Sequence, residues 1–265
     1  MNSEKGTAVI TGASSGIGAV YADRLAARGY DLVLIARSAD KLERVAEQIR
    51  AKSGRKIETY PADLTDHLDV ARVELLLKSD PDLSILVNNA GLGAVAPLLQ
   101  SEIDTMSMMI SLNVDALTRL SYAAVPQFVA RGAGTVINIA SIVGITPEQL
   151  NGVYGGTKAF VIAFSQSLRQ ELEGTGVKVQ AVLPGATATD FWDASGSSLE
   201  NLPDSIVMNA GDLVDAAIAD LDRGELVSIP ALQDAGLWDA YESARRAMFG
   251  KLSNKNVAPR YRRAA

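Results

Sequence analysis

The 265-residue chain contains no cysteine and only one histidine, His67. The absence of cysteine excludes disulfides, thiolate zinc sites, iron–sulfur clusters and cysteine nucleophiles. A single histidine leaves little for a serine–histidine–aspartate triad or a histidine-based metal site. Because His67 stands at the polar start of an expected helix, we interpret it as a surface residue. The sequence therefore predicts no metal site and argues against hydrolase and zinc-enzyme chemistry.

Positive charge is also scarce, since 25 Lys and Arg face 31 Asp and Glu, a net charge of −6. Nucleic-acid binders carry concentrated positive charge, so we expect no nucleic-acid partner. The most apolar stretch, residues 83–99, is interrupted by Asn88, Asn89 and Pro97, which argues against a membrane span. The N-terminus has mixed charge and lacks a cleavage-type site. These features favour a cytoplasmic protein with no membrane partner.

Short apolar runs alternate with amphipathic stretches along nearly the whole chain. Continuous apolar runs are typical of buried parallel strands, and parallel neighbours need crossover connections. The alternation therefore predicts an α/β fold with a single doubly wound parallel sheet and helices on both faces, a Rossmann-like architecture. We expect about seven strands, near Thr7, Asp31, Ile57, Ile85, Thr135, Val177 and Leu226.

No linker or charge block divides the chain, so we expect one domain over residues 1–250. Residues 184–205 are rich in Gly, Ser, Thr and Asp. A loop of that length in a compact domain is usually functional, and we interpret it as a substrate lid. Residues 251–265 form a basic tail without acidic side chains, which we interpret as solvated or docked in an oligomer rather than as a nucleic-acid arm.

The segment Thr11–Gly18, with the sequence TGASSGIG, follows the first expected strand and opens a helix. Gly12 permits a tight turn, Gly16 lets the backbone approach a pyrophosphate, and Gly18 lets helix and strand pack closely. The start of the helix offers unpaired N–H groups and partial positive charge. This context predicts a dinucleotide-binding turn.

The end of the second expected strand selects the cofactor. An NAD site normally places an acid there for the ribose 2′-hydroxyl, but Arg37 and Ser38 stand there and no carboxylate precedes Asp40. Arg37 could bind a 2′-phosphate, with Ser38 and Ser14 adding hydrogen bonds. The alternative is that Arg37 is solvated and Ser38 only caps the next helix. We expect NADP(H) to be preferred over NAD(H).

Tyr154 and Lys158 are four residues apart in an apolar helical stretch, where such residues share a face. A neighbouring ammonium favours the phenolate, so we expect Lys158 to lower the pKa of Tyr154. A tyrosine tuned in this way serves as a general acid/base near neutral pH.

Further polar residues stand in the order and spacing of one protein family. They are Asp63, the run Asn88–Gly91, Asn113, Ser141 and the segment Pro184–Thr189. Together with the glycine turn and the tyrosine–lysine pair, they resemble the short-chain dehydrogenase/reductase family over nearly the full length of the chain.

The resemblance implies a catalytic set of Asn113, Ser141, Tyr154 and Lys158. Tyr154 would exchange a proton with the substrate oxygen, and Ser141 would hydrogen-bond the same oxygen. Lys158 would hold the nicotinamide ribose hydroxyls and lower the pKa of Tyr154. Asn113 would hold a water in the proton relay from Lys158 to solvent.

For the cofactor, the resemblance implies that Asp63 meets the adenine and that residues 89–91 line the side of the adenine ribose. The Thr187 backbone and the Thr189 side chain would orient the carboxamide. With the residues argued above, the expected cofactor-binding set is Gly12, Ser14, Ser15, Gly16, Ile17, Gly18, Arg37, Ser38, Asp63, Leu64, Asn89, Ala90, Gly91, Tyr154, Lys158, Pro184, Gly185, Thr187 and Thr189.

Apolar residues are expected to line the substrate pocket. They are Val95, Val143, Ile145, Leu150, Phe191 and Trp192. Since no lysine or arginine falls in these segments, an uncharged ketone, aldehyde or secondary alcohol is favoured over a charged acid. The sequence thus predicts an NADP(H)-dependent oxidoreductase that transfers hydride to or from such a small molecule.

Two other functions stay open at this point. A carrier-linked 3-oxoacyl reductase of the same family would need a basic docking patch, for which the sequence offers the scattered Arg119, Arg131 and Arg169. A non-catalytic dinucleotide sensor would have no need of Tyr154. The resemblance also implies a homo-oligomer, a dimer or a tetramer, paired through long helices near 105–131 and 152–172.

Overall fold

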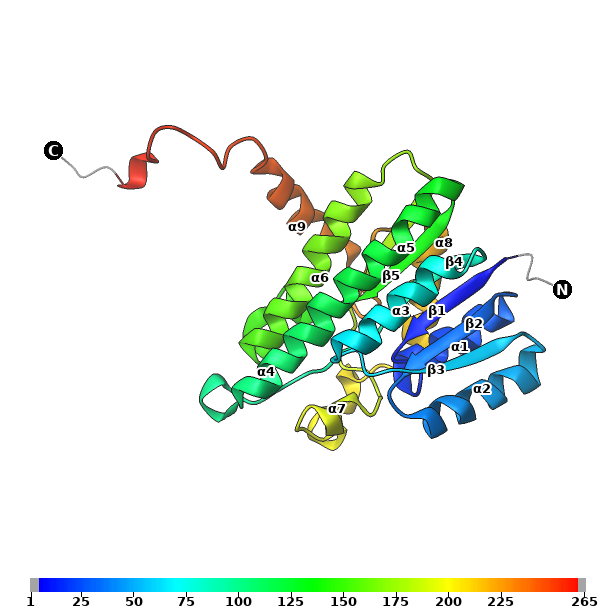
Figure 1. Ribbon diagram of the computed structural model, residues 1–265. Helices are drawn as coiled ribbons and strands as arrows, with labels where there is room; N and C mark the ends of the chain where they lie inside the picture. The colour runs from blue at the N-terminus through cyan, green and yellow to red at the C-terminus, as the bar shows by residue number, and fades with distance from the viewer. Residues whose placement is uncertain (1–4, 262–265) are drawn as a thin grey trace. The chain divides into compact units, whose positions relative to one another are not determined.

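The computed structural model describes residues 5–261, so residues 262–265 of the expected basic tail lie outside the described residues. Within that range a single sheet has the strand order β3-β2-β1-β4-β5-β6-β7, and every neighbouring pair is parallel (Figure 1). The strands are β1 (Thr7–Thr11), β2 (Asp31–Ala36), β3 (Ile57–Pro61), β4 (Leu83–Asn88), β5 (Gly134–Ile139), β6 (Val177–Val182) and β7 (Val227–Ser228). The predicted doubly wound parallel sheet and its strand positions are confirmed.

Two layers of helices cover the sheet, one on each face. The first apolar core packs β-strand residues against α1 (Gly16–Ala27), α2 (Ala39–Ser53) and α8 (Ala210–Arg223). The second packs the opposite face against α3 (His67–Ser79), α5 (Leu117–Arg131) and α6 (Gly152–Glu171). His67 is exposed at the first position of α3, as expected.

The sheet order reverses between β1 and β4, because β1 continues to β2 on one side and pairs with β4 on the other. The strands run parallel, so the loops that follow β1 and β4 leave the same edge of the sheet and diverge there. Ligands of doubly wound folds bind at this point. The glycine turn follows β1 and the run Asn88–Gly91 closes β4, so the fold brings two of the expected motifs together at the switch point.

The helix expected near residues 105–131 is divided into three parts. Helix α4 (Ile103–Ile110) continues into a π-helical segment, η2 (Ser111–Ala116), and then into α5. Single π-helical turns are frequent at functional sites. Asn113 lies within this segment and is buried.

The expected lid, residues 184–205, holds short helical turns rather than open coil. They are α7 (Phe191–Ala194), η5 (Leu199–Asn201) and η6 (Asp204–Ile206). Backbone hydrogen bonds join the two ends of the lid: Ala188 N–H donates to Met208 O at 2.9 Å, and Met208 N–H donates to Ala186 O at 2.8 Å. These bonds hold the start of the lid against Met208, which follows the lid in the sequence.

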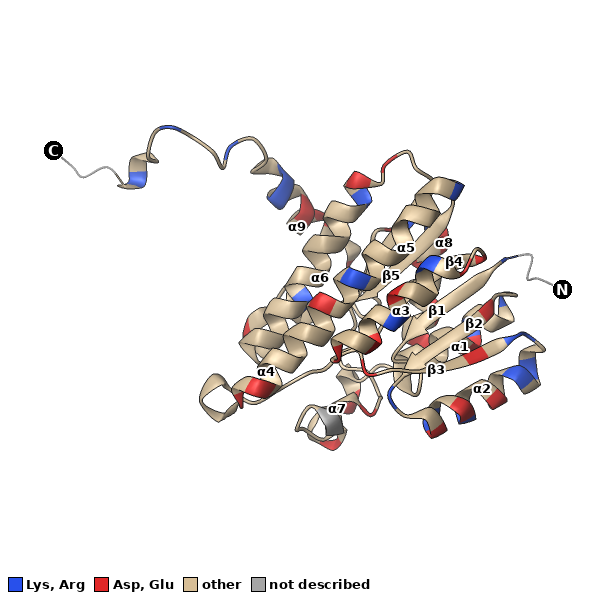
Figure 2. Cartoon of the chain, in the orientation of Figure 1, with Lys and Arg blue, Asp and Glu red and all other residues tan. Residues whose placement is uncertain are grey.

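The contacts group the chain through residue 231 into one compact unit and the chain from residue 232 into a second. The second unit contains α9 (Ala235–Ala247), whose N-cap Asp234 accepts a hydrogen bond from Gly236 N–H at 2.9 Å. Its later part carries cationic side chains, drawn blue in Figure 2. The domain boundary expected at residue 250 stays a prediction. Among the described residues, no helix combines the length and apolarity needed to cross a membrane.

Candidate active site

The glycine turn between β1 and α1 is shaped by what lies against it. Gly12 has φ +66°, and a Cβ there would lie 2.7 Å from Asn89 Nδ2 and 2.9 Å from Ala90 Cα. A Cβ on Gly18 would lie 2.5 Å from the same Nδ2 and closer still to the carbonyl oxygen of Gly12. Ser15, the N-cap of α1, makes no side-chain capping bond within the described chain. The first N–H groups of α1 are thus available to an anion.

Hydrogen bonds clip the end of β4 to this turn. The Thr11 hydroxyl accepts from the N–H groups of Asn89 and Ala90, both at 2.9 Å, and donates to Val87 O at 3.3 Å. In return, Asn89 Nδ2 donates to Thr11 O at 2.9 Å and to Gly12 O at 3.1 Å. Both motifs at the switch point therefore form one rigid unit.

Arg37 lies directly after β2 and is exposed. Within residues 5–261 it makes no hydrogen bond or ion pair, whereas Ser38 accepts a capping bond from Lys41 N–H at 3.4 Å. Nearby, Asp63 accepts from the N–H and the hydroxyl of Thr65 at 2.9 and 2.7 Å. Partial burial opposes ionisation of Asp63, but these bonds and the charge of Arg37 hold its pKa below the usual range.

The four expected catalytic residues come together from three elements. Tyr154 and Lys158 lie on α6, Ser141 lies two residues after the end of β5 and Asn113 lies in η2. All four are buried, and the Ser141 hydroxyl, which donates to Pro184 O at 3.3 Å, is near enough to Tyr154 to affect its pKa. Lys158 Nζ donates to Ile139 O at 2.9 Å and lies 5.8 Å from the centroid of the Tyr154 ring.

The Asn113 side chain links the loop after β4 to α6 through hydrogen bonds. Its Oδ1 accepts from Leu92 N–H at 2.9 Å, and its Nδ2 donates to Leu92 O at 2.8 Å and to the Thr157 hydroxyl at 3.0 Å. Both amide N–H donors are therefore engaged with protein groups. The water-holding role of Asn113 stays a prediction.

An apolar cluster surrounds Tyr154. It contains three of the expected pocket residues, Val143, Leu150 and Phe191, and Trp192 meets the Phe191 ring edge-on with centroids 5.7 Å apart. Ile145 instead packs in a separate cluster with residues of α6, and Val95 is half-buried outside the described clusters. Sequence reasoning missed other members, which are Leu92, Ala94, Met106, Met109, Ile142 and Val153.

Sequence reasoning also missed Asn151, the N-cap of α6. Its Oδ1 accepts from the N–H groups of Val153 at 2.9 Å and Tyr154 at 3.4 Å. Its Nδ2 donates to Ala96 O at 2.6 Å and to the Ser101 hydroxyl at 3.1 Å. One side chain therefore joins the catalytic helix to the loop after β4. The preference of helix starts for asparagine offered a hint of the first half of this role.

With this geometry in view, the relatives of the chain become informative. Residues 6–200 match the family model described as short chain dehydrogenase. The chain belongs to this family. The family resemblance inferred from the motifs is confirmed, and the short-chain dehydrogenase described here is an oxidoreductase that acts on alcohol and carbonyl groups.

Three proteins illustrate the similarity. A short-chain dehydrogenase from Sphingobium yanoikuyae, solved in complex with NADPH, is 46% identical with a TM-score of 0.93, over 97% of this chain and 100% of that one. The bulky-bulky ketone specific alcohol dehydrogenase from Comamonas testosteroni is 41% identical with a TM-score of 0.89, over 97% and 98%. A very-long-chain 3-oxoacyl-CoA reductase from Rattus norvegicus is 39% identical over 188 residues, which are 69% of this chain and 59% of that protein.

Burial dominates the protonation of the dehydrogenase's central pair. Burial raises the pKa of Tyr154 to about 12, although the polar side chain of Ser141 acts in the opposite direction. It lowers the pKa of Lys158 to about 8. In this structure burial, and not the charge of Lys158, dominates the Tyr154 pKa, and the Lys158 ammonium donates to Ile139 O, so the expected lowering of the Tyr154 pKa by Lys158 is not observed.

The residues present fit a dinucleotide at the glycine turn of this dehydrogenase. A Cβ on Gly12 or Gly18 would overlap Asn89 or the backbone, so only glycines allow this tight turn, and the turn leads into the start of α1, where Ser15 makes no side-chain capping bond within the described chain. The lid reaches the same turn, because a Cβ on Gly16 would lie 3.0 Å from Thr189 Cγ2. Among the described residues, no group of three or more His, Asp or Glu could hold a metal ion.

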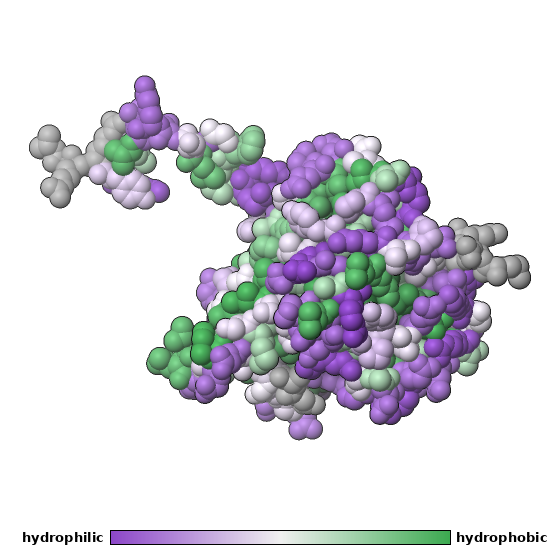
Figure 3. Space-filling model, viewed as in Figure 1, coloured by the Kyte–Doolittle hydropathy of each residue, from purple (hydrophilic) through white to green (hydrophobic). Residues whose placement is uncertain are grey.

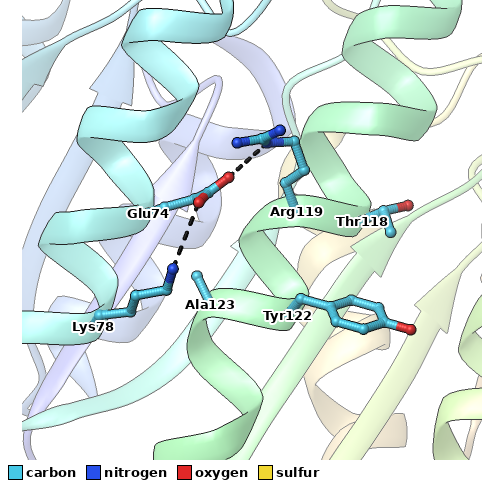
Figure 4. Close-up of a pocket in the computed structure, with 6 residues that line it drawn as sticks. All are labelled: Glu74, Lys78, Thr118, Arg119, Tyr122 and Ala123. Atoms are coloured by element: carbon cyan, nitrogen blue, oxygen red, sulfur yellow. Dashed lines mark hydrogen bonds and ion pairs between the residues drawn. The ribbon is translucent and has the colours of Figure 1, made fainter.

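A surface hollow of about 330 Å³ between α3 and α5 is not part of this site (Figure 4). Glu74 lies at its centre and is engaged by Arg119 at 2.6 Å and Lys78 at 3.6 Å. None of the expected site residues of the dehydrogenase lines it.

Proposed function

We propose that this dehydrogenase transfers hydride between NADP(H) and an uncharged, largely apolar ketone or aldehyde, or the matching secondary alcohol, with Tyr154 as general acid/base. The observation that carries the proposal is the burial of Tyr154 inside an apolar cluster, with the Ser141 side chain close enough to affect its pKa. A charged group in such surroundings loses its hydration without a partner, whereas a neutral carbonyl needs only one or two donors. The cluster therefore favours a neutral substrate.

The proposed chemistry divides among three side chains. In the reduction direction, the Tyr154 hydroxyl gives its proton to the carbonyl oxygen while Ser141 donates a hydrogen bond to the same oxygen. The Lys158 ammonium would bind the ribose next to the nicotinamide, and the nicotinamide would supply the hydride. Since the pKa of Tyr154 is raised, the phenol is protonated at neutral pH and suits carbonyl reduction. Alcohol oxidation would gain from higher pH.

The preference for NADP(H) rests on Arg37. Within the described residues no hydrogen bond or ion pair engages the Arg37 guanidinium at the end of β2, which would leave it available to a 2′-phosphate, with Ser38 and Ser14 as further hydroxyl donors. The relative from Sphingobium yanoikuyae, solved with NADPH, supports this choice. The other residues of the expected cofactor-binding set remain part of the same proposal.

A second candidate substrate is a 3-oxoacyl thioester. It is suggested by the sequence similarity to the reductase from Rattus norvegicus. Two of the arginines that a basic docking patch would use are engaged elsewhere. Arg119 pairs with Glu74, and Arg131 donates to the backbone oxygen of Pro81 at 3.1 Å. The neutral ketone is therefore the better supported substrate.

The test follows NADPH oxidation with neutral aryl and alkyl ketones, a 2-oxo acid and a 3-oxoacyl-CoA. We expect the neutral ketones to react fastest. Tyr154→Phe should lower kcat/KM by about 10²- to 10⁴-fold, with a much smaller change in NADPH affinity. Tyr122→Phe, an exposed tyrosine of α5, is the matched control. Full activity of Tyr154→Phe, or faster reduction of the 2-oxo acid, would overturn the proposal.

The proposal includes a cytoplasmic homo-oligomer, a dimer or a tetramer. Exposed apolar surface often marks an interaction site. The loop and helix around η1 (Leu98–Gln100) and α4 expose Leu98, Leu99 and Ile103, and green surface marks this region in Figure 3. Light scattering on the purified chain measures the mass directly, and a monomer at micromolar concentration would contradict this part.

A further inference from the structure

The ring of Phe191 lies against a position that has no side chain. A Cβ on Gly93 would lie 2.5 Å from Phe191 Cε2 and closer still to its Cζ. Gly93 does not have a positive φ, so its backbone conformation is open to other residues. The space taken by the Phe191 ring is thus what excludes a side chain at residue 93.

The same ring covers the reactive tyrosine. The centroids of Phe191 and Tyr154 are 5.8 Å apart with the ring planes at 40°, and only 5% of Tyr154 is exposed. A carbonyl carbon carries two substituents, and its oxygen must reach the Tyr154 hydroxyl. Those substituents must therefore enter space next to the Phe191 ring or replace it.

Phe191 differs from the other described members of this cluster because it comes from the lid. The remaining walls are fixed to the body of the protein, as Asn113 holds Leu92 and Asn151 holds Ala96. The lid ring is therefore the wall of the cluster that a change of lid position would move.

The lid segment also fixes where the ring lies. The indole N–H of Trp192 donates to Thr187 O at 3.0 Å, and the Thr189 hydroxyl accepts from Phe191 N–H at 3.4 Å. Trp192 meets Phe191 edge-on. The residues expected to orient the carboxamide of the cofactor thus also position the Phe191 ring. The same lid segment therefore affects both cofactor binding and the size of substrate that fits.

We propose that Gly93 and Phe191 form a pair that limits the size of the ketone substituents admitted to Tyr154. With the ring seated on Gly93, one substituent must be compact, and a ketone with two bulky substituents enters only when the ring leaves that seat. This inference rests on the proposed function, because it concerns which ketones the same site accepts.

The test compares kcat/KM for two neutral ketones, one with a methyl and an aryl substituent and one with two aryl substituents. Phe191→Ala should raise the ratio of diaryl to methyl aryl activity by about tenfold or more, since pocket changes of this size carry such factors. Gly93→Ala should move the ratio in the same direction, because its methyl group displaces the ring. In the double variant the effect of Gly93→Ala should vanish, as the ring it acts through is gone.

Two controls separate this inference from other outcomes. Phe160→Ala removes a phenylalanine of α6 that stacks on Phe164 outside the Tyr154 cluster, and should leave the ratio unchanged. Phe191→Leu is a milder second variant should the alanine variant not fold. The chain has two tryptophans, so a Trp238→Phe background leaves Trp192 as the sole emitter, and Gly93→Ala should shift its fluorescence.

Each outcome decides a different statement. If no ketone is reduced by the unaltered enzyme, the proposed function fails and the size limit falls with it. If ketones are reduced but both single variants leave the ratio and the Trp192 emission unchanged, the pair does not set substrate size and only this inference is overturned. Additive effects in the double variant would show that Gly93 acts independently of Phe191.

Discussion

The two sides of the active site are held by different kinds of contact. On the cofactor side, the hydroxyl of Thr11 and the amide of Asn89 bind backbone atoms at 2.9–3.3 Å. On the substrate side, the contacts that enclose Tyr154 are mainly apolar and aromatic, with Phe191 seated on Gly93. One side depends on directed bonds to the main chain and the other on the shapes of side chains.

This difference explains how one fold serves many substrates. Hydrogen bonds to the backbone weaken steeply with angle and distance, so the cofactor side tolerates little change. Apolar walls tolerate replacement when total volume is kept, and each replacement reshapes the pocket. Cofactor chemistry is therefore preserved while substrate preference varies with a few side chains.

The largest effect should come from breaking the cofactor side at Gly18. In Gly18→Ala the new methyl group overlaps Asn89 Nδ2 and Gly12 O, neither of which can move without disturbing the turn. We expect a loss of about 1–3 kcal/mol in stability, as for other overpacked sites. Affinity for NADPH and NADH should fall about 100-fold or more, which corresponds to about 3 kcal/mol. Fluorescence titration and thermal unfolding measure both.

Gly156→Ala is the matched control, because a Cβ at that helical position meets nothing within 4 Å. It should stabilise α6 by about 1 kcal/mol, the usual advantage of alanine over glycine in a helix. Unchanged cofactor affinity in Gly18→Ala would show that the close packing of the turn is not what preserves the site.

The next effect sharpens the comparison within the cofactor side. Arg37→Ala removes a charged donor from the expected 2′-phosphate but leaves the glycine turn untouched. NADPH affinity should fall about 10- to 100-fold, since hydrogen bonds to charged groups contribute about 1.5–3 kcal/mol. NADH affinity should change by less than about twofold, because NADH lacks that phosphate. Equal losses for both cofactors would sink the assignment of Arg37.

Lys158 lies between the cofactor side and the substrate side, and burying its ammonium lowers the stability of the folded protein. Its pKa is about 8 in the folded protein and near 10.4 in an unfolded chain, so between these values the unfolded state binds more protons. Stability due to this group therefore rises with pH across that window and is lowest below pH 8. The free energy of unfolding of Lys158→Met should exceed that of the unaltered protein by about 2–3 kcal/mol at pH 7, and this difference should shrink toward pH 10.

Denaturant unfolding at a series of pH values measures this effect. Lys178→Met replaces an exposed lysine and should give a difference that does not vary with pH. The activity of Lys158→Met should be lost in spite of its greater stability, as is common for groups buried for function. A stability difference that is flat between pH 7 and pH 9.5 would contradict the lowered pKa of Lys158.

The fold and the positions of the cofactor-side motifs could be predicted from the sequence because their requirements are local. Strand positions follow from apolar runs, and the glycine turn is a continuous segment whose spacing carries its geometry. The substrate side depends on residues far apart in the chain, such as Gly93 with Phe191, and no periodic pattern joins them. Ile145 illustrates the limit, since it stands close to Ser141 in sequence yet packs in another cluster. The raised pKa of Tyr154 has the same origin, because burial is a property of the assembled fold.

The smallest predicted effect tests one set of hydrogen bonds on the substrate side, those of Asn151. Asn151→Ser keeps an oxygen that can cap α6 but loses the amide donors to Ala96 O and Ser101. The loop after β4 should loosen, so we expect a stability loss of about 1 kcal/mol and a KM for ketone raised about threefold, with kcat changed less than about twofold.

The control for this variant is Asn209→Ser at the start of α8, where the asparagine oxygen also accepts a capping bond, from Gly211 N–H at 2.7 Å. Because serine keeps the capping oxygen, this variant should cost less stability than Asn151→Ser, and it should leave KM unchanged because α8 packs on the opposite face of the sheet from α6. If both variants raise KM equally, the effect reflects general loosening. If Asn151→Ser alone raises it, the Asn151 amide helps to position the loop after β4, which forms a wall of the substrate side opposite the lid residue Phe191.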